Sequence, residues 1–428
     1  MDETPCGTIV VFDYNWSGHI PAYHRLIVES ALRAGWKVVS LSGGYREVLA
    51  HVNQYFPEAL GRLIAPSCPE LGRPPERKTK LAFLRWLPGG FALWSIIRRN
   101  PFLRARHAAM RWQACHAALA RMRHTHFSKD PDLLFLPYLD DMLEPLLRVD
   151  SLMVNIPWTG IYMSASDLRS PSQRAGIRAR LHLFSHPLCR GVAVLDDSIR
   201  SKLHTALPSG SIITFLPDVI GRESNQIESE NIRELLRRAR GRKIVGLLGH
   251  LSVAKNLKLL LDLASDSRNQ DLFFLFAGQY EPLGIPPATR NQLAQAAAGK
   301  WDNMWALLDR IPDDREFNAF ISRLDVVFAV YRDFCRSSNI LCKAALFRRP
   351  VIVAQGFCMA ERTAEYNLGL AVPENNPAAT ITAIRRLLTA PPAGDYERFA
   401  RDFSREEFEN RLSMALRQSL SLLSPPHV

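Results

Sequence analysis

Short runs of consecutive apolar residues alternate with helical patterns along most of this 428-residue chain. Residues 8–12 form an apolar run, residues 19–35 form a helical pattern that ends at a glycine, and residues 36–42 form a second apolar run. A strand that is apolar on both faces must be covered on both faces, which is typical of parallel sheets flanked by helices. We therefore expect β-α-β units with right-handed crossovers.

The alternation occurs in two blocks, separated by a polar linker and entry helix at residues 221–242. Further strands of the first block are expected at 131–143, 151–158, 191–197 and 211–220. Strands of the second block are expected at 243–249, 272–278, 305–308, 325–331, 350–355 and 368–372. The pattern predicts two doubly wound, Rossmann-like α/β domains in tandem, with the ligand in the crevice between them.

Composition and cysteine usage favour a globular cytoplasmic protein. Hydrophobic residues make up 47% of the chain and charged residues 22%, which is ordinary for globular domains. The seven cysteines are scattered without a CxxC pair, so we expect reduced thiols and no zinc site. No apolar stretch is long enough to span a bilayer, and the first residues lack the apolar core of a signal peptide.

The net charge of +12 is concentrated in one segment, residues 73–128. This segment holds twelve lysines and arginines and a single acid, Glu76, which leaves an excess of +11. Tryptophan and phenylalanine side chains are interleaved with the cations, a mixture that suits an anionic membrane surface. A solvated helical face over a core stripe is the alternative. Nucleic acid is not an expected partner, because no recognition module is present.

The sequence GHLSVAKN, residues 249–256, stands where an expected strand gives way to a helix. A glycine followed by a cation at such a turn fits a phosphate, because helix N-termini present free N–H groups and a positive dipole end. A surface loop with a solvated lysine is the alternative interpretation.

These residues, taken in order with later motifs, resemble the nucleotide-sugar domain of glycosyltransferase family 4, on the two-domain GT-B fold. Gly249, Leu251 and Lys255 have the spacing of the family's G-R-L and K-G motif, and Ala277 with Gly278 match its next strand end. Residues 335–352 take the place of its glycine-rich stretch, and residues 396–416 are similar to its last helix. The resemblance covers roughly residues 242–420.

The resemblance implies a division of the chain. Residues 1–215 would form the acceptor-side domain, with the basic helical insertion at 57–128. Residues 216–395 would bind the nucleotide-sugar, and residues 396–428 would form C-terminal helices that pack back on the first domain.

Three positions depart from the family pattern. Cys335 and Lys343 stand where the family has the two glutamates that contact the donor sugar and the ribose, and His250 replaces an arginine. Lysine cannot accept hydrogen bonds from hydroxyl groups, although it can pair with a phosphate. We therefore hypothesise that Lys255 and Lys343 both face the donor diphosphate.

The predicted site follows from the turn, the resemblance and the strand ends. No metal site stands out in the sequence. His19, after Gly18 at the first strand-to-helix turn, and Asp140 are the candidate catalytic residues, with Asp141 as the rival of Asp140 and a helix cap as the alternative role. The candidate substrate-binding residues are Gly18, Gly249, His250, Lys255, Arg310, Ile311, Ser337, Ser338, Asn339, Ile340 and Lys343.

The function expected from the resemblance is metal-independent transfer of a hexose, with retention, from a nucleotide-sugar to a glycan or lipid-linked acceptor of the cell envelope. It would occur at the cytosolic membrane surface and need no cofactor besides the nucleoside-diphosphate donor. Two alternatives stay open: a catalytically weak nucleotide-sugar-binding or partner subunit, and a nucleotide-sugar epimerase on the same fold.

Overall fold

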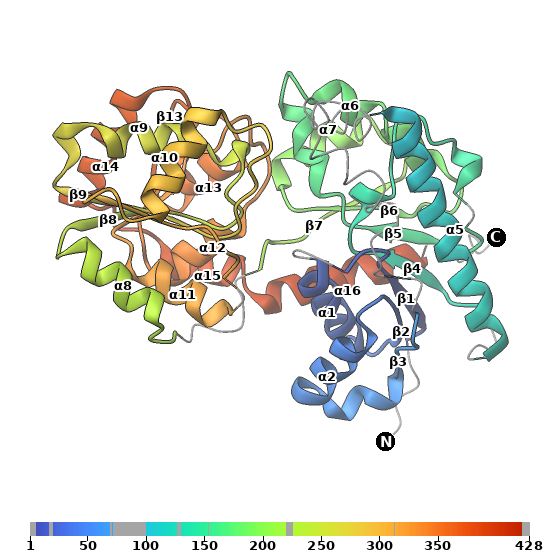
Figure 1. Cartoon of the computed structure of the whole chain (residues 1–428). Coiled ribbons are helices and arrows are strands. Elements are labelled where there is room, and N and C mark those ends of the chain that lie inside the picture. The colour runs from blue at the N-terminus through green and yellow to red at the C-terminus, as the bar shows by residue number, and fades with distance from the viewer. Residues whose placement is uncertain are drawn as a thin grey trace, which may run out of the picture. The chain divides into compact units, whose positions relative to one another are not determined.

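A computed structural model describes residues 6–16, 20–68, 71, 100–125, 130–152, 154–219, 226–311 and 313–421. The chain forms two compact units. The first comprises Met1–Leu216 together with Glu409–Val428, and the second comprises Pro217–Phe408. Each unit is an α/β layer structure, so the predicted fold class of two Rossmann-like domains is confirmed (Figure 1).

The first unit is built on a parallel sheet with the strand order β3-β2-β1-β4-β5. These strands are β1 (Thr8–Phe12), β2 (Lys37–Leu41), β3 (Leu63–Ile64), β4 (Leu133–Leu136) and β5 (Trp158–Gly160). A second pair, β6 (Gly191–Val194) and β7 (Ile212–Phe215), continues from β5 through isolated bridges at Trp158 and Ile161. Both faces of this sheet are covered, so β1 and β4 consist of apolar residues that are almost entirely buried.

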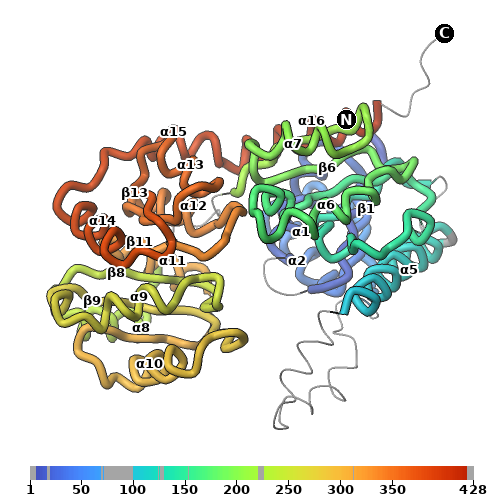
Figure 2. Tube along the Cα trace, turned by 90° about the horizontal axis from the view of Figure 1, so that it is seen from above, coloured from blue at the N-terminus to red at the C-terminus, as the bar shows by residue number. Residues whose placement is uncertain are grey.

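Helices of the first unit present their apolar faces to this core. They include α1 (Ile20–Arg33), α2 (Tyr45–Tyr55), α5 (Pro101–Thr125), α6 (Arg174–Arg178) and α7 (Arg200–His204). On α5, Ala108, Trp112, Cys115 and Leu119 are buried at helical spacing, and the Trp112 indole donates to the Met142 carbonyl at 2.9 Å. In both views α5 lies at the outer edge of the unit (Figures 1 and 2).

Two expectations for the first unit were wrong. The strand expected over residues 151–158 is not formed in its described part: Ser151 ends a 3₁₀ turn, and β5 begins only at Trp158, directly after Pro157, which has no N–H to donate to a ladder. Leu63 pairs with Val38 in β3, so the beginning of the expected insertion belongs to the sheet. Most of the basic segment 73–128 lies outside the described residues; within it, the structure describes 100–125.

The second unit is a six-stranded parallel sheet with the order β10-β9-β8-β11-β12-β13. All six strands coincide with predicted apolar runs: β8 (Lys243–Leu248), β9 (Leu272–Ala277), β10 (Met304–Leu307), β11 (Val326–Ala329), β12 (Val351–Ala354) and β13 (Gly369–Val372). The strand order reverses between β8 and β11, and such reversals are where doubly wound sheets bind ligands.

Helices cover both faces of this sheet. Figure 1 shows α9 (Leu257–Ser265), α10 (Pro287–Ala297) and α14 (Pro377–Thr389) on one face, and α8 (Glu230–Ala239), α11 (Asp314–Arg323) and α12 (Asn339–Leu346) on the other. The helix α13 (Cys358–Glu365) precedes β13. Side-chain caps start several of them: Ser229, Asp313 and Asn376 each accept a backbone N–H of the first turn.

The C-terminal segment divides between the two units. The helix α15 (Tyr396–Asp402) belongs to the second unit, where the Tyr366 hydroxyl donates to Asp402 at 2.7 Å. The helix α16 (Arg405–Ser421) returns to the first unit from Glu409 onward, and Arg411 lies over the Phe215 ring at 4.8 Å. The boundary expected at residue 395 therefore lies at 408, because α15 packs on α12 within the second unit.

Candidate functional site

The carboxyl ends of the six strands in the second unit gather their following turns at one edge of the sheet. The turn after β8 begins at Gly249, whose N–H donates to the Ala277 carbonyl at 2.9 Å. Gly278, after β9, has φ of +134°, and a Cβ there would lie 1.9 Å from the Gly249 carbonyl oxygen. Gly278 is therefore needed for these turns to pack against each other, and Gly249, with φ of +106°, is favoured by its backbone conformation alone.

The rest of this turn is tied to the ends of β11 and β13. The Arg332 N–H donates to the Ala254 carbonyl at 2.8 Å, and the Asn256 amide donates to the Glu374 carbonyl at 2.7 Å. Glu374 also accepts the Asp333 N–H at 2.7 Å through its own carboxylate. Residues 249–256 thus have one defined conformation, in which Asn256 occupies the left-handed region just before α9.

Lys255 is held over aromatic rings and not by an acid. Its Nζ lies 3.5 Å from the centroid of the Tyr331 ring and 5.6 Å from that of Phe334. No carboxylate forms an ion pair with it within the described part of the chain. A ring face attracts an ammonium without using up its N–H donors, so Lys255 keeps donors for an anion at this edge.

The stretch before α12 offers few free side chains for binding a donor. Cys335 is fully buried, and the Ser337 hydroxyl donates to Asp218 at 2.8 Å while it accepts from Arg362. Ser337 therefore belongs to a partly buried polar cluster with Asp218 and Arg362. Ser338 is the N-cap residue of α12 and makes no side-chain cap bond. Of the next two residues, Asn339 is exposed and Ile340 is buried.

Lys343 has a different role from the hypothesised one. Its ammonium donates to Asn318 at 2.9 Å and to Asp314 at 3.3 Å, and it lies over the Phe317 ring at 5.2 Å. All three partners belong to α11, because Lys343 lies on the face of α12 that packs against this helix. The structure thus assigns the Lys343 ammonium to a helix–helix contact.

The other predicted substrate residues have fewer described contacts. His250 and Arg310 are exposed and Ile311 is half-buried, each following a strand of the second unit. Gly18 and His19 lie outside the described residues, so the structure says nothing about them.

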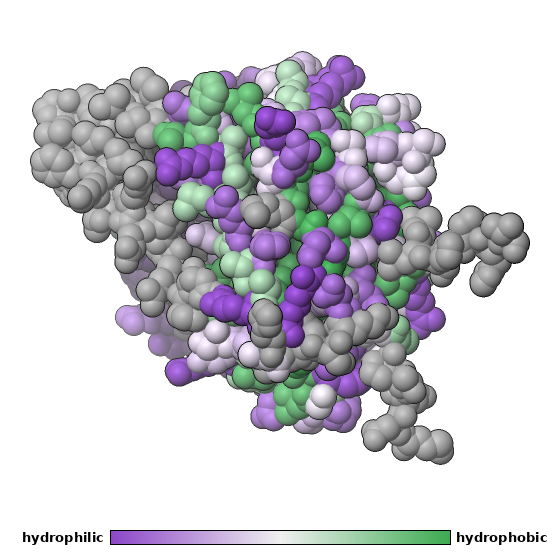
Figure 3. Space-filling model, turned by 90° about the vertical axis from the view of Figure 1, so that its right-hand side faces the viewer, coloured by the Kyte–Doolittle hydropathy of each residue, from purple (hydrophilic) through white to green (hydrophobic). Residues whose placement is uncertain are grey.

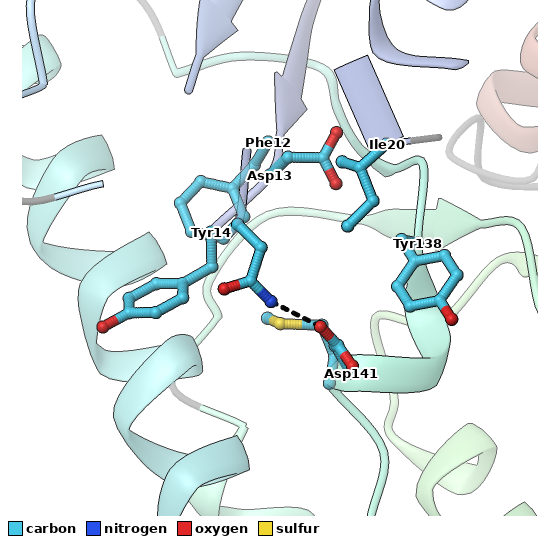
Figure 4. A pocket seen from close by; sticks show the side chains of 8 residues that line it. Phe12, Asp13, Tyr14, Ile20, Tyr138 and Asp141 are labelled. Carbon is cyan, nitrogen blue, oxygen red and sulfur yellow. Dashed lines mark hydrogen bonds between the residues drawn. The ribbon is translucent and has the colours of Figure 1, made fainter. Parts of the chain in front are cut away.

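In the first unit, Asp140 acts as a helix cap. Its two carboxylate oxygens accept the backbone N–H groups of Met163 and Ser164 at 2.9 and 2.8 Å. The structure thus gives Asp140 the capping contacts named as its alternative role, and its catalytic role stays a prediction. The neighbouring Asp141 instead lines a pocket at the carboxyl ends of β1 and β4 (Figure 4).

That pocket also contains Asp13, the residue directly after β1. Asp13 Oδ2 lies 2.7 Å from His24 Nδ1, and His24 Nε2 lies 2.8 Å from the Ser40 hydroxyl. All three side chains are buried, with exposed fractions of 4%, 0% and 0%. When Asp13 is ionised, a neutral His24 satisfies both partners by donating from Nδ1 to the carboxylate and accepting the Ser40 proton at Nε2.

Burial raises the pKa of Asp13 to about 6, against the lowering effect of the His24 hydrogen bond and charge. The negative charge of Asp141 raises this pKa further. A carboxyl group that ionises close to neutrality and lines a pocket is typical of functional sites.

Sequence reasoning missed Asp13, Asn15, Tyr138, Tyr331 and Phe334 as site residues. Asp13 and Tyr331 each follow an apolar run, so their positions at strand ends were visible in the sequence. Their partners were not, because His24 and Lys255 reach them from other elements.

Among the described residues, no three histidine, cysteine, aspartate or glutamate side chains gather closely enough to bind a metal ion. None of the described helices combines the length and the apolar character that crossing a bilayer requires.

Comparison with known proteins agrees with this architecture. Residues 242–390 match the family described as "Glycosyl transferases group 1". No curated protein matches the chain.

Solved structures match nearly the whole chain at low sequence identity. They include Anabaena HepE in complex with UDP-glucose (12% identity, 96% of this chain and 99% of that one, TM-score 0.61). Sucrose-phosphate synthase from Thermosynechococcus elongatus has 15% identity, covers 97% and 99%, and has a TM-score of 0.64. A glycosyltransferase from Rickettsia africae has 11% identity, covers 98% of each chain, and has a TM-score of 0.56. The chain therefore has the GT-B fold, and its second unit resembles the group 1 glycosyl transferases.

Proposed function

We propose that this chain is a glycosyltransferase that uses a nucleoside-diphosphate sugar as donor. In this proposal the second unit binds the donor and the first unit binds the acceptor. The observation that carries it is the turn at residues 249–256, whose Lys255 ammonium is held over Tyr331 and Phe334 at the carboxyl edge of the sheet. The solved structures of HepE are complexes with UDP-glucose and with UDP, and their similarity to this chain supports this choice of donor.

The chemistry requires stabilisation of the diphosphate as the glycosidic bond breaks. A fixed cation without a competing carboxylate supplies positive charge at that point and needs no metal ion. We accordingly propose that transfer proceeds without a metal and, following the resemblance to family 4, moves a hexose with retention. Activity that survives treatment with EDTA and a product with the donor's anomeric configuration, assigned by NMR, would agree with both statements.

The direct test is a panel of nucleotide-sugars. Calorimetry measures binding of each nucleoside diphosphate, and release of the diphosphate from its sugar measures turnover with and without acceptors. We expect binding of at least one nucleotide and acceptor-dependent turnover of its sugar. Failure of every nucleotide to bind the folded protein would refute the proposal.

A catalytically weak nucleotide-sugar-binding protein is the second candidate. The buried Cys335 and the Lys343 contacts with α11 favour it, because neither residue supplies the carboxylate that the family uses to contact the donor. Binding of the intact nucleotide-sugar without turnover, across the whole acceptor panel, would select this candidate.

We also propose that the protein works at the cytoplasmic face of an anionic membrane on a glycan or lipid-linked acceptor of the cell envelope. On α5, Phe102 and Met110 are exposed, with Arg106 on the same side of the helix. Figure 3 shows hydrophobic and hydrophilic residues interspersed over the described part of that side of the molecule. Co-sedimentation with anionic but not neutral vesicles, reduced in Phe102→Ser and by salt, is the expected result. Equal sedimentation with both vesicle types would contradict it.

A further inference from the structure

Lys255 rests on two packed aromatic rings at the carboxyl edge of the second sheet. Its Nζ lies 3.5 Å from the centroid of the Tyr331 ring and 5.6 Å from that of Phe334, both within the distance of about 6 Å at which a ring face attracts an ammonium. The two rings meet edge to face, with their centroids 5.3 Å apart and their planes at 88°. Tyr331 is only 1% exposed, so packing fixes the ring on which the ammonium rests.

A backbone hydrogen bond brings the lysine and this ring together. The N–H of Arg332, directly after Tyr331, donates at 2.8 Å to the carbonyl of Ala254, directly before Lys255. The bond joins the turn after β8 to the end of β11, the two paired strands between which the strand order reverses. The contact between Lys255 and the ring is therefore set by the topology of the sheet.

An acid of the same edge contacts the neighbour of Lys255 and yet does not pair with the lysine. The Asn256 amide donates to the Glu374 carbonyl at 2.7 Å, and the Glu374 carboxylate accepts the Asp333 N–H at 2.7 Å. No ion pair joins Glu374 to Lys255 in the part of the chain that the structure describes. Such a pair would occupy N–H donors of the ammonium, whereas a ring face leaves them available for an anion.

The Tyr331 hydroxyl takes no part in holding the lysine. It is buried, and it has no hydrogen-bond partner among the described residues. The contact with Lys255 is made by the ring, so phenylalanine at this position keeps the contact and removes only an unpaired hydroxyl group. Tyr331→Phe thus separates the role of the ring from that of the hydroxyl.

We infer that Tyr331 is a positioning residue of the donor site: its ring holds the Lys255 ammonium in place before the nucleotide binds. The inference rests on the proposed function and names the group that prepares Lys255 for the diphosphate. A lysine side chain loses much rotamer freedom when a ligand fixes it, and fixing it beforehand reduces this cost of binding. Without the ring, Lys255 is ordered only when the nucleotide binds, so the affinity for the nucleotide is lower.

The test measures nucleotide binding to the full-length protein by calorimetry. UDP, ADP and GDP are the probes, and the one that binds the parent most tightly is used for the variants. Tyr331→Phe should bind this nucleotide as the parent does, and Tyr331→Leu should bind it about two- to tenfold more weakly. In a Lys255→Met background the same leucine change should have no further effect, because no ammonium is left to hold.

A second series of variants separates the electronic effect of the ring from its packing. Phenylalanine analogues with one, two and three ring fluorines are incorporated at position 331. Fluorine withdraws negative charge from the ring face, which is the part that attracts the ammonium, while the size of the ring changes little. Nucleotide affinity should therefore fall stepwise from the Tyr331→Phe value toward the Tyr331→Leu value, a trend that a purely structural role of the ring would not produce.

The matched control is Phe317→Leu, which removes the ring 5.2 Å from the ammonium of Lys343, and it should leave nucleotide affinity unchanged. Parental affinity in Tyr331→Leu, equal affinities across the fluorinated series, or an undiminished leucine effect without Lys255 would overturn the inference and leave the proposed function standing. Weaker binding by Tyr331→Phe would also overturn it, because the hydroxyl would then be the group that matters. Failure of the parent to bind any of the three nucleotides would refute the proposed function, and the inference with it.

Discussion

Replacing Asp13 by asparagine should make the first unit more stable at neutral pH. The pKa of Asp13 rises from 3.8 to about 6 in the folded protein, because burial disfavours its charged form. The folded state therefore binds this proton more tightly than the unfolded state does, and ionisation above the folded pKa costs stability. A difference of about two pKa units corresponds to about 3 kcal/mol.

The direction of the pH dependence follows from this shift. Below about pH 4 the carboxyl group is protonated in both states, so Asp13 contributes no penalty. As the pH rises through the window from 3.8 to about 6, the unfolded chain loses the proton first and the free energy of unfolding falls. Asparagine resembles the protonated carboxyl group in shape and can still accept the His24 proton, so it removes the penalty.

The measurement is urea-induced unfolding between pH 4 and pH 8, followed by fluorescence of Trp36, Trp112 and Trp158, which are buried in the first unit. Amide exchange in β1 identifies the transition that belongs to this unit. We expect Asp13→Asn to match the parent near pH 4 and to exceed it by up to about 3 kcal/mol at pH 7. His24, Ser40 and Asp141, which face Asp13, are present in both proteins.

The other ionisable groups are the same in the parent and in Asp13→Asn, so their effects on the free energy of unfolding cancel in the difference between the two proteins. Asp150→Asn, at an exposed position, should show no such pH-dependent gain. A variant that is less stable than the parent at every pH, or whose gain does not change between pH 4 and pH 7, would refute this account of Asp13.

Three further changes test the second unit. Lys255→Met should weaken nucleoside-diphosphate binding by about ten- to a hundredfold, because one charge-assisted contact is lost; calorimetry that finds parental affinity would exclude Lys255 from the donor site. Lys343→Met should leave that affinity unchanged and lower the free energy of unfolding by about 1–3 kcal/mol, because Asn318 loses a donor; weaker nucleotide binding with unchanged stability would restore the original hypothesis. Gly278→Ala should destabilise the second unit by at least about 2 kcal/mol, since its Cβ would meet the Gly249 carbonyl. Gly176→Ala, where nothing lies within 4 Å of the added atom, is the control, and equal denaturation midpoints would contradict the packing argument.

The fold was largely predictable because its strands are continuous apolar runs. All six strands of the second sheet were found from this pattern, whereas β3 has only two residues and leaves no pattern to detect. The strand predicted over 151–158 was wrong because the prediction rested on the apolar content of this stretch and did not take into account that Pro157 cannot donate to a strand ladder.

The site was less predictable because it depends on side-chain direction. Asp140 and Asp141 are adjacent in the sequence, yet one caps a helix and the other lines the pocket. Lys343 stands where the family has an acid, but its position along α12 turns the ammonium to α11. Such choices are fixed by tertiary contacts, and the sequence pattern carries no information on them.

The division of the chain also governs the order in which its units can be completed during synthesis. The second unit is continuous, so all of Pro217–Phe408 is available before the last helix has been made. The first unit has parts on both sides of the second unit in sequence, so it lacks the part of α16 from Glu409 onward until this helix has been made, including Leu412 and Leu416, which are 1% and 0% exposed. The first unit is thus completed only after the second has been translated, and the apolar side chains that Leu412 and Leu416 cover stay uncovered in the nascent chain until then.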